Sequence, residues 1–363
     1  MPLPSYGLHA GWNGELWEKV GHELAPRRIA TIGITVGAAS AADAEWAGTP
    51  AVQALYERAK KEGEVIFWGP QQREVAWVPE AFATVFPAIE VKTLGDGDIA
   101  TKAIAEARAG RHQVDVFFSA YPSMLLLVQR GLLAQQDWSM FGVTARDVAY
   151  EGRVGFTHTI AYSVVYHREK VKEPDLPQHW TELLDERYKG KMVSSPFLLP
   201  RMLASIGMDW GEERVLQFAR DLVTQTDIML TRAPRESLLQ SGERLYAIAE
   251  IEVQARLWAL EGIPVGFIIP DPAVIVPLGV GVMAKAPHPN AARLLAGWMA
   301  SVEGRRARKT AVFSGDYRQG SEDPLVKELE ARGVKILVDD VAHVAARQKL
   351  MNRLSPIISG QAR

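Results

Sequence analysis

The sequence predicts an α/β fold built from two units. Short apolar, strand-like segments alternate with helix-like segments of roughly ten to fifteen residues, which is typical of βαβ units and a largely parallel sheet. The alternation runs from residue 49 and restarts after residue 155, with no Pro/Ser-rich linker in between. The chain has 363 residues, of which 47% are hydrophobic, so it can bury enough surface for two domains. We therefore expect two α/β lobes joined by strands that cross directly between them.

Local patterns justify the elements of the first unit in turn. Residues 49–62 form a predicted helix because Val52, Leu55 and Ala59 recur on one face. The run EVIFW over 64–68 is rich in β-formers and is bounded by glycines, so it is a predicted strand. The same criteria predict, in chain order, a helix over 75–86, a strand over 89–94, a helix over 99–109, a strand over 114–118 and a helix over 125–130.

The second unit repeats the alternation and is followed by a long apolar strand. Its predicted elements are a strand over 156–166, a short helix over 180–185, a strand over 190–193, a helix over 215–224 and a strand over 245–251. An apolar, β-rich strand is then expected over 273–284, and a turn at Pro287 and Pro289 leads to a helix over 290–302. That helix carries one predicted buried stripe, formed by Ala292, Leu295, Trp298, Met299 and Val302.

The composition argues against several classes of protein. The 41 basic and 43 acidic residues leave a net charge of −2, which gives no electrostatic footprint for nucleic acid or an anionic membrane. The chain has no cysteine, so disulfides, thiolate zinc sites and cysteine nucleophiles are excluded. A lipid-modified N-terminal cysteine is excluded for the same reason. No segment after residue 44 is apolar over the ~20 residues that a membrane span requires.

The first 44 residues are expected to be a leader that contains a signal peptide. Arg27-Arg28 precede a run of small and apolar residues over 29–41, and two A-x-A cleavage sites lie within 39–44. The run is shorter than the ~20 residues that cross a bilayer. We therefore expect secretion to the periplasm, with the mature chain beginning between Ala42 and Glu45. A buried N-terminal strand or helix is the alternative interpretation.

The stretch over 269–304 is the most informative of the chain and reads IPDPAVIVPLGVGVMAKAPHPNAARLLAGWMASVEG. Six further segments stand out, in chain order: ALYERAKKEGEVIFWGP, VDVFFSA, LVQRGLL, IAYSVVYHREKV, LPQHWTELLDERYKGKMVSSP and LLQSGERLYAIAE. In wording and order these segments resemble the extracellular solute-binding proteins of ABC importers (family 1), in the branch that includes ferric-binding proteins. The resemblance implies a type II periplasmic binding fold, in which two α/β lobes hold a ligand in the interlobe cleft and close by strand hinges.

This fold implies a division of the chain and a place for the ligand. Lobe 1 is expected from 45–155 plus 266–310 and lobe 2 from 156–265 plus 311–363, with hinges near 155–159 and 266–271. In open α/β sheets, ligands bind at the carboxyl ends of the strands, where helix N-termini also attract anions. The expected ligand-binding residues are Gly69, Pro70, Gln71, Ser119, Ala120, His158, Ser194, Ser195, Arg232 and Glu250.

The chain departs from the iron-binding relatives at their metal ligands. Those relatives use two adjacent tyrosines just after the strand that ends here near Glu250, and this chain has no Tyr-Tyr pair. Glu250 and Glu252 remain possible oxygen ligands for ferric iron. An anionic or chelated solute contacted by Arg232 and Ser195 is the preferred ligand. The alternative roles are that Ser195 caps a helix and that Arg232 is solvated or paired with a neighbour such as Glu236.

The function that follows is capture of a small solute and its delivery to an ABC transporter permease by a monomer without a cofactor. The GxGxxA match over 279–284 is rejected as a dinucleotide site because Pro287 and Pro289 delay the helix that it requires. Three alternatives remain: a ferric-iron or iron-chelate binding protein, a ligand-sensing partner of a membrane receptor, and an enzyme on the same fold. The enzyme is the least favoured, because the best-known enzyme with this fold anchors its cofactor through a cysteine.

Overall fold

A computed structural model describes residues 45–360 of the chain. The leader predicted over 1–44 lies outside the described residues, as does the expected cleavage region up to Ala44. No helix of the described part is long and apolar enough to cross a membrane.

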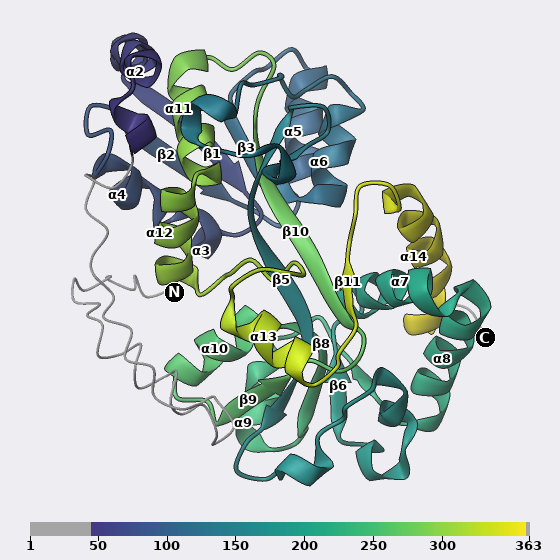
Figure 1. Ribbon diagram of the computed structural model, residues 1–363. Coiled ribbons are helices and arrows are strands. Elements are labelled where there is room, and N and C mark those ends of the chain that lie inside the picture. The colour runs from purple at the N-terminus through teal and green to yellow at the C-terminus, as the bar shows by residue number, and fades with distance from the viewer. Residues whose placement is uncertain (1–44, 361–363) are drawn as a thin grey trace, which may run out of the picture.

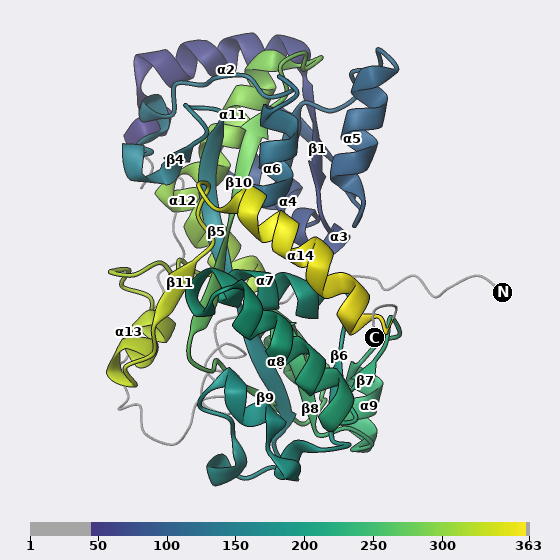
Figure 2. The same ribbon diagram turned by 90° about the vertical axis from the view of Figure 1, so that its right-hand side faces the viewer.

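The molecule has two lobes that share one sheet (Figure 1). The strand order is β2-β1-β3-β10-β5-β8-β6-β7, with β4, β9 and β11 paired at its sides. The upper lobe in Figures 1 and 2 holds β1 (Glu64–Gly69), β2 (Glu90–Gly95), β3 (Val116–Ala120) and β4 (Val148–Ala149). The lower lobe holds β6 (Met192–Ser194), β7 (Met229–Leu230), β8 (Tyr246–Ile251) and β9 (Val265–Ile268). The long strands β5 (Val154–His167) and β10 (Ala273–Val282) run from one lobe into the other, and β11 (Ile336–Val338) pairs with β10.

Helices cover both lobes (Figures 1 and 2). The helices that accompany the upper strands are α2 (Pro50–Glu62), α3 (Gln72–Val75), α4 (Val78–Ala83), α5 (Ile99–Arg108), α6 (Tyr121–Val128), α11 (Pro289–Ala300) and α12 (Val302–Val312). Those on the lower side are α7 (Leu198–Trp210), α8 (Glu212–Gln225), α9 (Glu236–Ser241), α10 (Glu252–Leu260), α13 (Pro324–Ala331) and α14 (Val344–Ile358). The 3₁₀ helices are Glu45–Gly48, Ser139–Phe141, Ala145–Asp147, Glu173–Asp175, Trp180–Leu184 and Glu186–Tyr188.

The sheet is mixed, whereas the sequence predicts a largely parallel one. Pairs β1–β2, β1–β3, β6–β7 and β6–β8 are parallel, as βαβ units require. β10 is antiparallel to both β3 and β5, and β5 is antiparallel to β8 and β9. The two strands that cross between the lobes therefore run in opposite directions, and this pairing carries no signal in a local sequence pattern.

Each lobe has its own apolar core. The first core draws its buried residues from 47–143 and 278–300, among them Phe67, Phe82 and Trp298. The second draws on 162–276 and 350–358, including Trp180 and Leu203. Helix α11 has the expected buried face, but it ends at Ala300 because the Ser301 hydroxyl accepts the Gly304 N–H and starts α12. Val302, which was predicted to belong to the buried stripe, is 48% exposed.

Candidate functional site

The structure places the residues expected at strand ends at the carboxyl edges of their strands. Gly69 closes β1, and Pro70 and Gln71 lead into α3. Ser119 and Ala120 close β3, directly before α6. These loops belong to the upper lobe. In the lower lobe, Ser194 closes β6, Ser195 follows it, and Glu250 is the penultimate residue of β8.

Gly69 is required by close packing between β1 and α3. A Cβ added at Gly69 would lie 2.6 Å from Cγ1 of Val75 and 3.0 Å from Cδ1 of Phe118. The turn is also tied to β2, because the side chain of Gln72 accepts a hydrogen bond from the Gly95 N–H at 3.1 Å. The loop after β1 thus sits tightly against the sheet and holds α3 at its edge.

The two serines after β6 serve the fold of the lower lobe. Ser194 is fully buried, and its hydroxyl donates to the Ile248 carbonyl of β8 at 2.6 Å. The Ser195 hydroxyl accepts from the N–H groups of Phe197 and Leu198 at 3.2 and 3.4 Å. This is the capping role named as the alternative for Ser195, and it occupies N–H groups at the start of α7 that an anion would otherwise use.

His158 lies inside the upper lobe, in a cluster with two charged residues. Its Nδ1 accepts a hydrogen bond from Nε of Arg308 at 3.0 Å. The other guanidinium nitrogens of Arg308 donate to Oε2 of Glu74 at 3.1 and 2.9 Å. Since Nδ1 is an acceptor, Nε2 of the neutral ring carries the proton. Burial and the charge of Arg308 lower the pKa of His158 well below its ordinary value, so the ring stays neutral. The cluster fixes α3 to α12 and β5.

Glu250 is held by charges from two neighbouring segments. It is 2% exposed, and its Oε1 accepts a hydrogen bond from Nε of Arg235, just before α9. Across from it, Nη1 of Arg73 in α3 donates to Oε1 of Gln254 in α10 at 2.6 Å, which links the two lobes. Burial raises the pKa of Glu250, and the Arg235 hydrogen bond and the charges of Arg235 and Arg73 oppose that rise. We call Arg73, Arg235, Glu250 and Gln254 the strand-end site.

A bulge in β8 directs Glu250 towards this site. The pairing with β5 shifts by one residue, so that Ser163 faces Glu250 and Val164 faces Ile248. The extra residue, Ala249, has a φ of 60°, in the left-handed region that residues other than glycine rarely adopt. Regular alternation would put Glu250 on the same face as Ile248, which belongs to the second core. The bulge puts it on the opposite face instead.

Glu252 does not join Glu250 at this site. It begins α10, is fully buried, and its Oε2 accepts the Ala161 N–H of β5 at 2.8 Å. In the part of the chain that the structure describes, no group of three or more His, Asp or Glu side chains is placed to hold a metal ion. The two glutamates left as candidate iron ligands therefore have separate surroundings.

Arg232 is exposed in the loop after β7, where its guanidinium lies 4.8 Å from the ring centre of Phe197. Phe197 is itself 52% exposed and precedes α7. Among residues 45–360, no ion pair joins Arg232 to Glu236, the neighbour considered from sequence. Arg232 thus lies over Phe197 at the start of α7, with no ion pair among the described residues.

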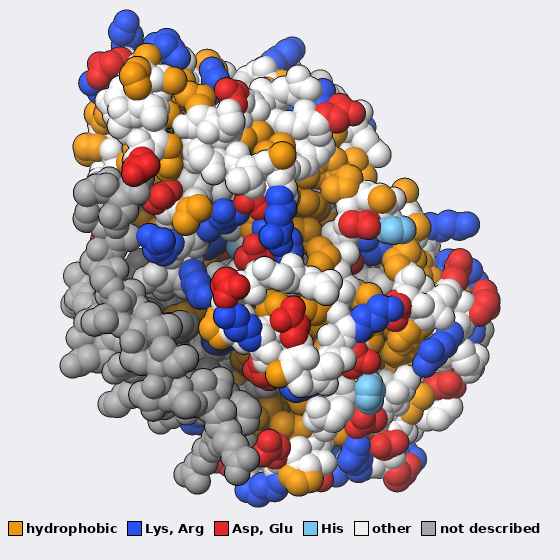
Figure 3. All heavy atoms as spheres, viewed as in Figure 1, with side chains coloured by type: hydrophobic (Ala, Val, Ile, Leu, Met, Phe, Trp, Pro, Cys, Tyr) orange, Lys and Arg blue, Asp and Glu red, His pale blue; other side chains and the backbone are white. Residues whose placement is uncertain are grey.

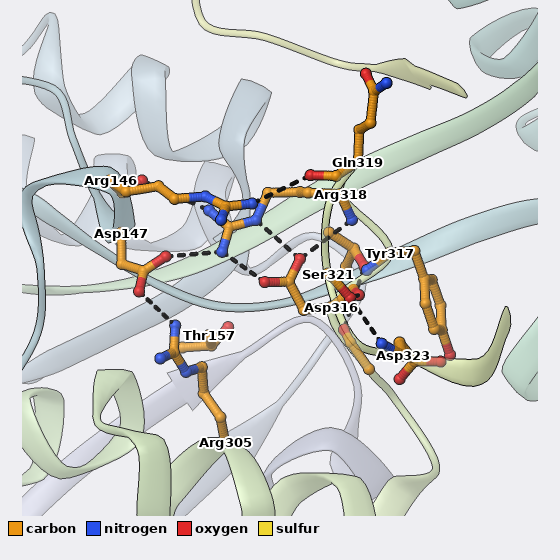
Figure 4. Close-up of polar contacts among 12 residues, drawn as sticks. Arg146, Asp147, Thr157, Arg305, Asp316, Tyr317, Arg318, Gln319, Ser321 and Asp323 are labelled. Atoms are coloured by element: carbon orange, nitrogen blue, oxygen red, sulfur yellow. Dashed lines mark hydrogen bonds and ion pairs between the residues drawn. The ribbon is translucent and has the colours of Figure 1, made fainter. Parts of the chain in front are cut away.

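A second charged network fastens the segment between α12 and α13 to α12 and to the 3₁₀ helix Ala145–Asp147 (Figure 4). Arg318 donates to Asp147 at 2.7 Å and to Asp316 at 2.6 Å, and Arg305 donates to Asp147 at 2.8 Å. Burial raises the pKa of Asp147, but the bonds from the two arginines outweigh it and hold that pKa below its usual value. Next to this network, the Thr159 hydroxyl accepts the Tyr317 N–H at 2.7 Å. Basic and acidic side chains are mixed across the middle of this face (Figure 3).

The sequence reasoning missed Arg73, Arg235 and Gln254. Arg73 lies two residues after Gln71, the last residue expected in the loop after β1. Its short distance in sequence from the end of that strand is the feature by which the sequence could have identified it. Its partner Gln254 is 181 residues further along the chain. Only the folded structure brings these two together.

Comparison with known proteins agrees with this architecture. Residues 113–331, more than half of the chain, match the bacterial extracellular solute-binding protein family. Iron-bound HitA from Pseudomonas aeruginosa has a TM-score of 0.64 at 17% identity, over 80% of this chain and 99% of HitA. The substrate-binding protein of an ABC transporter from Agrobacterium tumefaciens has a TM-score of 0.69 at 15% identity, over 83% of this chain and 96% of that protein. FutA from Trichodesmium, in complex with iron and citrate, has a TM-score of 0.63 at 15% identity, over 83% of this chain and 99% of FutA.

At these identities the solved structures show the fold, and they confirm the expected type II periplasmic binding architecture. No curated protein sequence matches the chain. The family assignment rests on the match over 113–331, which also confirms the resemblance seen in the sequence. The chain therefore belongs to the bacterial extracellular solute-binding protein family.

Proposed function

We propose that the chain is a periplasmic solute-binding protein that captures an anionic or anion-associated solute at the strand-end site and delivers it to an ABC transporter permease. One observation carries the proposal: Arg73 of the upper lobe reaches Gln254 of the lower lobe, and its charge acts on Glu250, which Arg235 binds. Arg235 is paired with Glu250, and Glu236 also acts on that carboxylate. Arg73 has no carboxylate partner among residues 45–360, so it is the cation left for an anionic ligand.

The loops named from sequence complete the proposed lining. Gly69, Pro70 and Gln71 support α3, and Ser119 and Ala120 close the neighbouring strand. The Ser195 hydroxyl already caps α7, so the anion would depend on guanidinium groups more than on that helix start. An iron chelate with negative charge fits the same cations.

The test begins with a thermal-shift screen of anionic, neutral and cationic solutes. Calorimetry with the best solute is then repeated on Arg73→Gln. A hydrogen bond to a charged group contributes about 1.5–3 kcal/mol, so affinity should fall about tenfold or more. The control is Arg220→Gln, on the exposed face of α8, where the side chain donates a hydrogen bond to Gln217. Unchanged affinity in Arg73→Gln would contradict the proposal, as would tight binding of bare ferric iron with no anion present.

Export through the predicted leader is part of the same proposal. The family is extracellular, and the sequence over 27–44 has the pattern of a signal peptide. We expect N-terminal sequencing of periplasmic protein to begin between Ala42 and Glu45. A cytoplasmic protein that keeps residues 1–41 would contradict the periplasmic role.

A further inference from the structure

The segment between α12 and α13, residues 313–323, passes from the upper lobe to the lower lobe beside β5 (Figure 1). Where it meets β5, the N–H and the hydroxyl of Thr159 both donate to the Gly315 carbonyl, at 2.9 and 3.2 Å. Thr159 lies between the part of β5 that pairs with β4, which ends at Gly155, and the part that pairs with β8, which begins at Tyr162. The segment therefore touches β5 where that strand crosses between the lobes. We call residues 313–323 the strap.

Tyr317 fastens the strap to the lower lobe. Its side chain is 2% exposed and belongs to an apolar cluster built by α13, β9, β11 and the first residues of β10. Among the members of this cluster are Ile275 of β10, Leu329 of α13 and Phe267 of β9. Burial of a large aromatic ring is strongly favourable, so Tyr317 moves with the lower lobe.

The next residue, Arg318, fastens the strap to the upper lobe. Its Nη2 donates to Oδ1 of Asp147 at 2.7 Å, and its guanidinium lies 3.6 Å from the ring centre of Phe156. Asp147 directly precedes β4, and Phe156 lies in the half of β5 that belongs to the upper lobe. A further contact joins the Arg146 guanidinium to the Gln319 carbonyl at 3.3 Å. Arg318 therefore moves with the upper lobe.

Two neighbouring residues that are anchored in different lobes define a pivot. The peptide bond between Tyr317 and Arg318 is trans, so their Cα atoms stay about 3.8 Å apart. Their side chains point away from each other, with Arg318 directed towards Asp147 (Figure 4). The lobes can therefore rotate about this point, but they cannot separate at it while both anchors hold.

We propose that Tyr317 and Arg318 are positioning residues for solute capture: they fix the point about which the lobes rotate, so that closure presents Arg73 to the same part of the lower lobe each time. The contact that closure must reproduce is the Arg73–Gln254 hydrogen bond of 2.6 Å, which joins the lobes. Hydrogen bonds weaken steeply with distance and angle, so rotation about a shifting point would lose it. This inference rests on the proposed function and adds to it the residues that guide closure.

Asp147 offers a matched control for the experiment. Arg305 of α12 donates to it at 2.8 Å, nearly the same distance as from Arg318. Arg305 and Asp147 both belong to the upper lobe, whereas Arg318 belongs to the strap. Arg305→Met and Arg318→Met thus each remove one donor from the same carboxylate, and only Arg318→Met cuts a link between the lobes. Both variants should have a lower melting temperature than the wild type.

The measurement is the distance between two spin labels that flank the pivot, in the protein without solute. The chain has no cysteine, so Thr144→Cys in the upper lobe and Glu330→Cys in α13 place one label on each side at exposed positions. Wild-type protein should give one narrow distance distribution. Arg318→Met should broaden it and shift it to longer distances, and Arg305→Met should leave it unchanged. Arg318→Lys keeps a cation for Asp147 and should broaden it less than Arg318→Met.

The pivot is overturned if the wild type already gives a broad distribution, if Arg318→Met keeps the narrow one, or if Arg305→Met broadens it as much. No solute is present, so these outcomes leave the proposed function standing. Calorimetry with the best solute of the thermal-shift screen completes the test: affinity should fall in Arg318→Met and not in Arg305→Met, and equal affinities would overturn the positioning role. If Arg73→Gln leaves affinity unchanged, the proposed function fails, and the positioning role with it.

Discussion

At the scale of single residues, Arg308 does the most to place the strand-end site without belonging to it. It is 1% exposed, lies 4.6 Å from the ring centre of Phe118, and donates to both Glu74 and His158. Glu74 and Arg73 are neighbours in α3 that point to different partners. Glu74 points to Arg308 inside the upper lobe, and Arg73 points to Gln254 in the lower lobe. By holding Glu74, Arg308 fixes the position of Arg73.

We expect Arg308→Met to destabilise the protein by about 3–5 kcal/mol, because it leaves the largely buried Glu74 carboxylate without its partner. Arg308→Met/Glu74→Met should recover part of the loss, since no isolated charge then remains. Chemical denaturation measures both variants. Arg306→Met, at an exposed position of the same helix, is the control. A double variant that is less stable than Arg308→Met would show that the ion pair is not the cause.

The sequence predicts the positions of some site residues and not their contacts. Glu250 and Ser119 were found because each ends a recognisable apolar strand, and strand ends meet at one edge of a sheet. The direction of Glu250 could not be found in this way, because the bulge at Ala249 breaks the alternation.

At the scale of elements, α3 is the part of the upper lobe that the site depends on most. The sequence predicts one helix over 75–86, but the structure has α3 and α4 with a break at Ala76-Trp77. The break allows α3 to pack against Gly95 at the end of β2. A Cβ on Gly95 would lie 2.1 Å from the backbone nitrogen of Gln72, so only glycine permits this contact.

We expect Gly95→Ala to displace α3 and weaken solute binding by at least tenfold, because Arg73 would move with the helix. The clash is with backbone atoms, which cannot rotate away, so stability should fall as well. Gly97→Ala is the matched control: it lies two residues away and a Cβ there meets nothing within 4 Å. Calorimetry and melting temperatures of both variants make the comparison. Equal behaviour of the two would argue against the role of α3.

Helix α10 makes stability depend on pH through Glu252. Burial raises the pKa of Glu252 to about 7, although the Ala161 N–H and Arg256 oppose the shift. The folded state therefore holds a proton that the unfolded state releases near its ordinary value of 4.5. The contribution of Glu252 to the free energy of unfolding is therefore fully present below pH 4.5 and is lost as the pH rises towards 7.

Glu252→Gln should remove this dependence while keeping an acceptor for the Ala161 N–H. Relative to the wild type, the variant should gain up to about 3 kcal/mol in unfolding free energy between pH 4.5 and pH 7.5. Urea denaturation across that range gives the difference, and Glu80→Gln, at an exposed position of α4, is the control. If the difference in unfolding free energy between the variant and the wild type stays constant across this pH range, Glu252 has the same pKa in the folded and unfolded states, which would contradict the prediction.

At the scale of the whole molecule, two strands carry the connection between the lobes. β5 pairs with β10 over 155–161 and with β8 over 162–166, so the crossing lies near residues 159–163 of β5. The second hinge was expected from the sequence near residues 266–271, which belong to β9 and the loop after it. In the structure the second strand that crosses between the lobes is β10. The lobe limits expected from sequence, 45–155 plus 266–310 and 156–265 plus 311–363, would divide β9, whereas β9 pairs with the lower part of β5. We propose that the bending lies at the crossings of β5 and β10.

Solute binding should then bring the lobes together, because the ligand joins Arg73 on one side to the lower lobe on the other. Solution scattering should show a smaller radius of gyration at saturating solute than without it. The Arg73→Gln variant, measured at a solute concentration that saturates it, should close less completely. A wild-type profile that does not change at saturation would contradict the hinge.

The packing of Trp77 against the Arg308 cluster gives the protein an optical signal of its own. Trp77 sits in the break between α3 and α4, with Arg308 5.6 Å from its ring centre and Trp298 at 5.8 Å. Any shift of α3 on solute binding changes the distance between this indole and a guanidinium, and indole emission responds to nearby charge. Titration of unlabelled protein should therefore change its fluorescence in proportion to occupancy, and Trp77→Phe should abolish most of that change. The transport ligand could then be sought by emission alone, without a dye or a radioactive solute.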